Sequence, residues 1–283
     1  MLVEEEKSVQ GHGISHLAMT IWPSRSWGKL IMGMFTACFD ASGSEDDPRT
    51  PFLTVAGFIS TAEQWEEFSD LWVKRINEDG IEYFRMAEFA HSVEQFEGWR
   101  GQEVRRRRLL GDLVCLIKKY AFRKFGTVVQ IKAMNGMDES VAREFHLTAY
   151  TLAGRVAIGD IRLWLTEEKL LDSRFAWVFE EGDEGQDKLR ERLEEDDLGA
   201  PNFRPKKDMR RKSGLLEPGF IPLQAADMLA YEISLAAQRQ NYDRWACNEF
   251  MQMLGRIGIF LSEDIQGLQK DLRTHGPYTP MTL

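Results

Sequence analysis

The sequence contains few cysteines and no long apolar run. Its three cysteines, Cys38, Cys115 and Cys247, form no C-x-x-C pair. An odd count without such pairs argues against a disulfide framework and against a structural zinc site. No run of about 20 residues is free of charge or proline, so the chain offers no candidate membrane-spanning helix. These absences predict a cytoplasmic protein that does not insert into a membrane.

Two common catalytic motifs and an excess of positive charge are also missing. The chain has neither a G-x-x-x-x-G-K phosphate loop nor a G-x-S-x-G nucleophile elbow. Its formal net charge of −9 provides no general attraction to nucleic acid or to an anionic membrane. Any contact with nucleic acid must therefore be local.

The chain is long enough to bury a large core. It has 283 residues, among them 17 Phe and 8 Trp, and we expect a single domain over residues 32–283 with a helical elaboration at its C-terminal end. Residues 1–31 show neither helical nor strand periodicity and are interrupted by Pro23, which predicts a disordered leader. The sequence MGMF that follows favours natural translation from Met32 or Met34.

Predicted strands and helices succeed one another along the chain. MFTACFD and PFLTVAGFIS are apolar enough for buried strands joined as a hairpin. The next segment is an amphipathic helix, with Trp65, Phe68 and Trp72 at i, i+3 and i+7. IEYFRMAEFAH suggests a strand and a loop, and further helices and strands follow. The order predicts an α/β fold, a mixed sheet flanked by helices.

Three acids have unusual positions. Asp40 ends the first strand and Glu180 ends the strand RFAWVFE, and glycine-containing loops follow both. In α/β sheets, ligands gather at the carboxyl ends of strands. Asp227 lies in FIPLQAADMLAYEI, which is otherwise the pattern of a buried helix, in line with Gln224 and Tyr231 beside the core-facing residues. A carboxylate in such a place needs a partner, a bound cation or a shifted pKa.

A divalent cation would explain all three acids together. Converging carboxylates repel one another unless a cation compensates them, and Mg²⁺ or Mn²⁺ prefers oxygen ligands of this kind. Such ions stabilise the attacking and leaving oxygens of a phosphodiester displacement. We therefore expect Asp40, Glu180 and Asp227 to be catalytic and metal-binding. The alternative for each acid alone is structural: a turn residue, a solvated loop residue, or an acid paired with an arginine.

Four motifs resemble a known family. FDASGS, YFRMAEFAHSVEQFEGW, VFEEGDEG and PLQAADMLAYE are similar to motifs of the domain-of-unknown-function 3800 family, over residues 34–238. The resemblance implies a ribonuclease H-like fold and a metal-dependent nuclease activity, in a family often associated with mobile elements and antiphage defence.

The resemblance also implies roles for individual residues. Asp40, Glu180 and Asp227 match the family's acids, Asp183 adds a further metal ligand, and Glu88 is a possible fourth acid. Supporting roles fall to Ser42 in FDASGS and Gln224 in PLQAADMLAYE. The family's middle motif usually has a histidine where this chain has Arg85, which leaves a histidine function in doubt.

A basic segment, RPKKDMRRK, precedes the helix that carries Asp227. Contact with phosphates through Lys206, Lys207, Arg210 and Arg211 would supply the local attraction to nucleic acid that the net charge lacks. The alternative is a solvated loop.

These features predict a nuclease that hydrolyses phosphodiester bonds with Mg²⁺ or Mn²⁺. The main alternative is a non-catalytic subunit that keeps the fold and binds nucleic acid or an effector partner. A third possibility is hydrolysis of a nucleotide or another small phosphoester. The sequence favours neither DNA nor RNA as the substrate and no particular oligomeric state.

Overall fold

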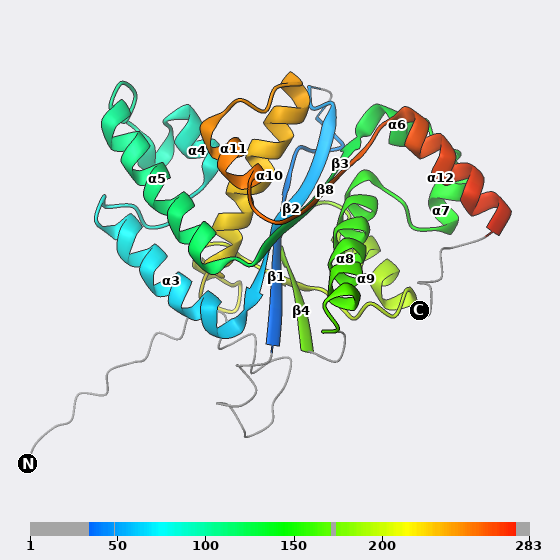
Figure 1. Ribbon diagram of the computed structural model, residues 1–283, viewed down its shortest axis with the longest axis horizontal. Helices are drawn as coiled ribbons and strands as arrows, with labels where there is room; N and C mark the ends of the chain where they lie inside the picture. The colour runs from blue at the N-terminus through cyan, green and yellow to red at the C-terminus, as the bar shows by residue number, and fades with distance from the viewer. Residues whose placement is uncertain (1–33, 48, 171–173, 276–283) are drawn as a thin grey trace, which may run out of the picture.

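A six-stranded mixed sheet runs through the protein (Figure 1). The computed structural model describes residues 34–47, 49–170 and 174–275, so the predicted leader, residues 1–31, and the predicted start Met32 lie outside the described residues. The sheet order is β5-β4-β1-β2-β3-β8. Its strands are β1 (Met34–Ser42), β2 (Phe52–Thr61), β3 (Arg123–Gln130), β4 (Arg174–Glu180), β5 (Asn202–Arg204) and β8 (Gly255–Phe260).

The strands combine antiparallel and parallel pairing. Strands β1, β2 and β3 form an antiparallel meander, which confirms the predicted hairpin. Strand β4 lies parallel to β1, β5 lies parallel to β4, and β8 lies parallel to β3. Because β1 and β4 run in the same direction, their carboxyl ends meet at one end of the sheet. This mixed sheet with helices on both faces confirms the predicted α/β class.

Helices cover both faces of the sheet (Figure 1). On one face lie α3 (Ala62–Asn77), α4 (Met86–His91), η1 (Glu94–Phe96), α5 (Glu103–Tyr120), α10 (Pro222–Arg239) and α11 (Trp245–Met251). The other face carries α6 (Ile131–Asn135), α7 (Glu139–Glu144), α8 (Ala149–Glu167), α9 (Gln186–Glu195) and α12 (Ser262–His275). Each face has its own hydrophobic core, so the sheet is buried on both sides.

Local sequence explains where the main helices begin. The Thr61 side chain accepts from the Gln64 N–H at the start of α3, and Thr148 forms a capping box at the start of α8. Helix α10 begins with Pro222, whose missing N–H is harmless in a first turn. The predicted apolar series of α3, which includes Trp65 and Trp72, is fully buried.

The structure departs from the sequence-based expectations in three segments. Residues 81–91, expected to form a strand and a loop, form a loop and then helix α4. The basic segment contains part of a short hairpin, β6 (Met209–Arg210) paired with β7 (Leu216–Glu217). The C-terminal elaboration is not purely helical, because β8 lies between α11 and α12 and extends the sheet.

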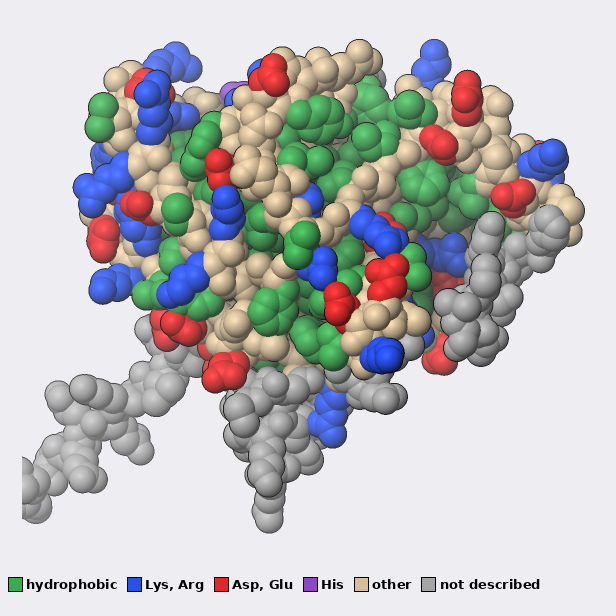
Figure 2. All heavy atoms as spheres, viewed as in Figure 1, with side chains coloured by type: hydrophobic (Ala, Val, Ile, Leu, Met, Phe, Trp, Pro, Cys, Tyr) green, Lys and Arg blue, Asp and Glu red, His purple; other side chains and the backbone are tan. Residues whose placement is uncertain are grey.

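The surface is mixed in charge. Figure 2 shows acidic and basic side chains interspersed over this face, with Lys and Arg most frequent around α5. No helix among the described residues is long and apolar enough to cross a membrane.

Candidate functional site

The structure brings the three predicted acids together. Asp40 in β1 and Glu180 at the end of β4 follow the paired residues Phe39 and Phe179, so they project side by side from adjacent parallel strands. Both face the side of the sheet that α10 covers, since α10 packs directly on β1 and β2. Helix α10 brings Asp227 to the same point.

One lysine ammonium lies between the three carboxylates. Lys206 Nζ is 2.8 Å from Asp40 Oδ2, 2.7 Å from Glu180 Oε2 and 2.8 Å from Asp227 Oδ1. The Lys206 side chain is only 5% exposed. A lysine therefore compensates the acid in the middle of the α10 sequence, and we call these four side chains the acid–lysine cluster.

Backbone amides hold the remaining oxygens of the two aspartates. Asp227 Oδ2 accepts a short hydrogen bond from the Met86 N–H, at the start of α4. Asp40 Oδ1 accepts from the Ala41 N–H at 2.8 Å. Both carboxylates are thus fixed in orientation by groups other than Lys206, which is the arrangement of a preorganised site.

Gln224, one turn before Asp227, fixes the backbone around the cluster. Its Oε1 accepts from Trp72 Nε1 and from the Phe84 N–H, each at 2.8 Å, and its Nε2 donates to the Lys206 carbonyl at 2.9 Å. Gln224 therefore joins α3, the loop before α4 and the segment that carries Lys206.

The cluster has strongly perturbed electrostatics. Burial raises the pKa of Asp40 to about 7, although the Lys206 charge lowers it, and burial likewise raises the pKa of Asp227. Burial is also the largest influence on Lys206 and lowers its pKa, but the charges of Asp40, Asp227 and Glu180 together outweigh burial and raise it. The lysine therefore stays charged, while one cation is too little to keep every nearby carboxyl ionised.

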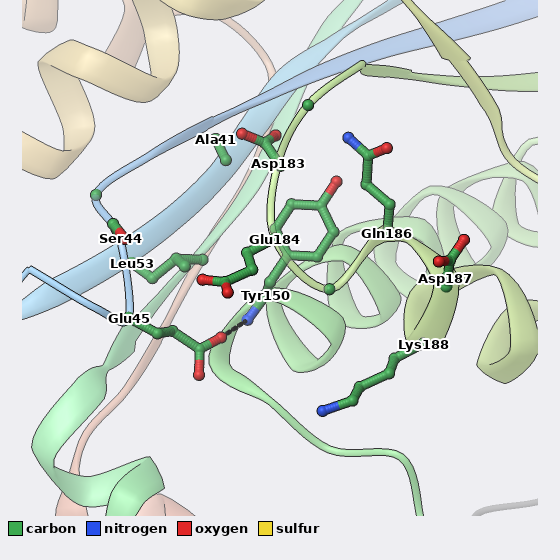
Figure 3. Close-up of a pocket in the computed structure, with 13 residues that line it drawn as sticks. Ala41, Ser44, Glu45, Leu53, Tyr150, Asp183, Glu184, Gln186, Asp187 and Lys188 are labelled. Carbon is green, nitrogen blue, oxygen red and sulfur yellow. Dashed lines mark hydrogen bonds between the residues drawn. The ribbon is translucent and has the colours of Figure 1, made fainter.

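A cavity of about 760 Å³ lies between the loops that follow β1 and β4, on the α8 side of the sheet (Figure 3), and none of the four cluster residues lines it. Ala41, Gly43, Tyr150, Gly182 and Asp183 line part of it. Figure 3 shows the Tyr150 hydroxyl directed toward the side of the cavity where Asp183 lies.

Two polar atoms in the cavity wall are buried and have no hydrogen-bond partner among the described residues. They are Tyr150 Oη and Asp183 Oδ2. Burial and the Asp40 charge raise the pKa of Asp183 to about 7, and burial and the Asp183 charge raise that of Tyr150. Unpaired buried polar groups are rare in native proteins, so this wall is suited to a polar ligand.

The other predicted site residues lie nearby. Ser42 is the last residue of β1, two positions after Asp40. Glu88 in α4 is buried, accepts from Tyr83 Oη at 3.2 Å and lies 3.9 Å from Arg85 Nη1. These contacts involve Glu88 Oε1, whereas Glu88 Oε2 is buried and has no hydrogen-bond partner among the described residues. Arg85, which replaces the family's histidine, is half-exposed, and its charge lowers the pKa of Asp183.

The basic segment does not lie as predicted. Lys206 was expected to contact phosphates at the surface, and this is wrong for the described conformation, because three carboxylates hold its ammonium in the interior. Lys207 and Arg210 are exposed. Arg211 forms ion pairs with Glu181 and Glu217, so acids already neutralise much of its charge.

The acid–lysine cluster fits a divalent cation in donor type but not in its present geometry. Carboxylate oxygens are the ligands that Mg²⁺ and Mn²⁺ prefer, and the ammonium stands where the oxygens of Asp40, Glu180 and Asp227 converge. Within the part of the chain that the structure describes, no group of three or more Asp, Glu, His or Cys side chains is spaced to hold a metal ion.

The sequence analysis did not assign two residues, Lys206 and Tyr150, to this buried site. Lys206 was assigned to the surface because its neighbours in RPKKDMRRK are basic, and Tyr150 lies in an ordinary helix start with no motif to mark it.

Comparisons of the chain with protein-family models, with curated proteins and with solved structures found no match.

Proposed function

We propose that this protein hydrolyses phosphodiester bonds of nucleic acid with Mg²⁺ or Mn²⁺, as a ribonuclease H-like member of the domain-of-unknown-function 3800 family. The observation that carries the proposal is the convergence of Asp40, Glu180 and Asp227 on one buried cationic group at the carboxyl ends of β1 and β4. The mixed sheet, with β1 paired to an antiparallel and a parallel neighbour, is compatible with that fold.

The converging acids would hold the cation, and Asp183 lies beside them at the cavity. Such a cation would supply positive charge for the phosphoryl oxygens and lower the pKa of a bound water. The chain's own contributions are orientation and exclusion of solvent. Met86 and Ala41 N–H groups fix the two aspartates.

The cavity and the exposed basic residues support a nucleotide chain as the substrate. The cavity of about 760 Å³ is large enough for one nucleotide unit, and Tyr150 Oη and Asp183 Oδ2 offer it polar contacts. Its lining holds four acids, Glu45, Asp183, Glu184 and Asp187, and one lysine, Lys188, so a phosphate there would need a cation to balance the acids. Lys207 and Arg210 are exposed close by in sequence to Lys206 and would contact backbone phosphates.

A second candidate is a non-catalytic subunit that binds nucleic acid or an effector partner. The position of Lys206 favours it, because a lysine that neutralises the acids gives the fold a stable site without any metal.

The test is cleavage of labelled single- and double-stranded DNA and RNA with Mg²⁺, with Mn²⁺ and with chelator. We expect metal-dependent cleavage that falls at least about 100-fold in Glu180→Gln, since loss of a metal ligand removes several kcal/mol of transition-state stabilisation. The matched control is Glu139→Gln, which changes an exposed acid of α7. Binding without cleavage would favour the second candidate, and activity on mononucleotides alone would favour a small phosphoester.

A further inference from the structure

Lys206 is held by its backbone as well as by its charge. The Pro205 carbonyl accepts from the Phe220 N–H at 2.7 Å, and the Lys206 carbonyl accepts from Gln224 Nε2 at 2.9 Å. A Cβ on Gly219 would lie 2.6 Å from the Lys207 Cα, so the chain packs closely there. The backbone of Lys206 is thus fixed against the start of α10, and movement is left to its flexible four-carbon side chain.

The ammonium occupies the oxygens that a metal ion would need. Each of Asp40, Glu180 and Asp227 directs one oxygen to Lys206 Nζ at 2.7–2.8 Å. A divalent cation at the same point would meet a positive charge within contact distance. The two cannot share these oxygens, because like charges at such a distance in a buried site repel strongly.

We propose that the Lys206 ammonium and a divalent cation are alternative occupants of the acid–lysine cluster, so that Lys206 closes the site until a metal ion displaces its side chain. The inference rests on the proposed function only in taking this cluster as the metal site. It makes Lys206 a regulatory residue of that site and not a surface phosphate contact.

The displaced ammonium has an acceptor nearby. Asp183 lines the cavity, and its Oδ2 is buried without a partner among the described residues. The Lys206 charge already lowers the pKa of Asp183. The side chain therefore exchanges one carboxylate environment for another when the metal ion enters.

With such competition, the apparent dissociation constant for the metal ion equals the intrinsic constant divided by the fraction of molecules in which the site is open. The test is Mn²⁺ binding, followed by the electron paramagnetic resonance of free Mn²⁺, in the parent, in Lys206→Met and in the control Lys74→Met, which changes an exposed lysine of α3. Methionine keeps an unbranched side chain and removes the charge. We expect Lys206→Met to bind Mn²⁺ at least about tenfold more tightly and Lys74→Met to bind like the parent.

A second measurement needs no variant. Acetylation of lysines in the parent protein, read by mass spectrometry, reports exposure of each amine. We expect Lys206 to be protected in chelator and to become reactive at saturating Mn²⁺, while the reactivity of the exposed Lys74 in α3 stays unchanged. If Lys206→Met does not fold in chelator, this measurement decides alone.

The outcomes separate this inference from the nuclease proposal. Equal or weaker Mn²⁺ binding by Lys206→Met, or continued protection of Lys206 at saturating Mn²⁺, overturns the inference even if the protein cleaves nucleic acid. Tighter binding with no cleavage supports the inference and contradicts only the nuclease. Absence of Mn²⁺ binding in both proteins contradicts both.

Discussion

At the scale of single residues, buried acids dominate the site. Burial raises the pKa values of Asp40 and Asp183 to about 7, well above the ordinary aspartate value. The folded protein therefore retains protons near neutral pH that the unfolded chain has already released. Each such carboxyl favours folding less as the pH rises from about 4 to about 7, because the unfolded state binds fewer protons across that window.

We predict that in chelator the free energy of unfolding falls as the pH rises from about 4 to about 7, and that Asp183→Asn makes this fall shallower. One retained proton corresponds to a slope of up to about 1.4 kcal/mol per pH unit. Urea unfolding at several pH values measures the slope. The control is Asp187→Asn, an exposed acid that pairs with Arg190, which should leave it unchanged. A slope that is the same in Asp183→Asn and the parent would contradict a raised pKa at Asp183.

At the scale of elements, the β6–β7 hairpin joins the site to the surface. Arg211 pairs with Glu181, directly after the catalytic candidate Glu180, and with Glu217 in β7. Arg210 points to the exposed turn, where it donates to the Gly214 carbonyl at 3.0 Å. The hairpin is thus fixed at the β4 end of the site and exposes charge at its tip.

We predict that only the exposed basic residues of this segment contribute to the salt dependence of nucleic-acid binding. Lys207→Gln and Arg210→Gln should each lower the slope of log K against log salt by about 1, as expected for one lost phosphate contact. Arg211→Gln should lower it less, because Glu181 and Glu217 already neutralise that side chain. Fluorescence anisotropy in chelator measures the slope. If all three variants keep the slope of the parent protein, the segment is a solvated loop that does not contact phosphates.

At the scale of the whole molecule, the central strands β1 and β2 lie between the two hydrophobic cores, and β1 also carries Asp40 of the site. Gly57 in β2 opposes Phe39 in β1, and a Cβ on Gly57 would lie 1.8 Å from the Cys38 carbonyl oxygen. The two strands can therefore keep this close approach only with glycine at this position. Asp40 follows one residue later on the same strand.

We predict that Gly57→Ala destabilises the protein by at least about 3 kcal/mol, because the backbone of β1 must move to admit the methyl group. Mn²⁺ binding should weaken in the same variant, since the shift displaces Asp40. The matched control is Gly111→Ala in α5, where a Cβ meets nothing within 4 Å; alanine there should stabilise the helix by up to about 1 kcal/mol. Urea midpoints compare the two, and similar midpoints would show that the strands can relax around Gly57.

Local pattern was sufficient for the α/β class, the β1–β2 hairpin and the position of the acids. The strand pattern places Glu180 at the end of β4 and Asp40 near the end of β1, which continues to Ser42, two residues beyond the predicted end. Helical spacing places Gln224 and Asp227 on one side of α10. These properties depend on neighbours within a few residues, which the sequence displays directly.

Only the tertiary structure decided what compensates the acids. Lys206 bonds to Asp40 across 166 positions of sequence, and Met86 donates to Asp227 across 141. The same lysine in RPKKDMRRK suits a solvated loop, a phosphate contact or a buried ion pair equally well by local pattern. The packing of its backbone against α10 turns the side chain inward. Long-range packing selects among these because a buried charge is tolerated only where partners from other elements are already in place.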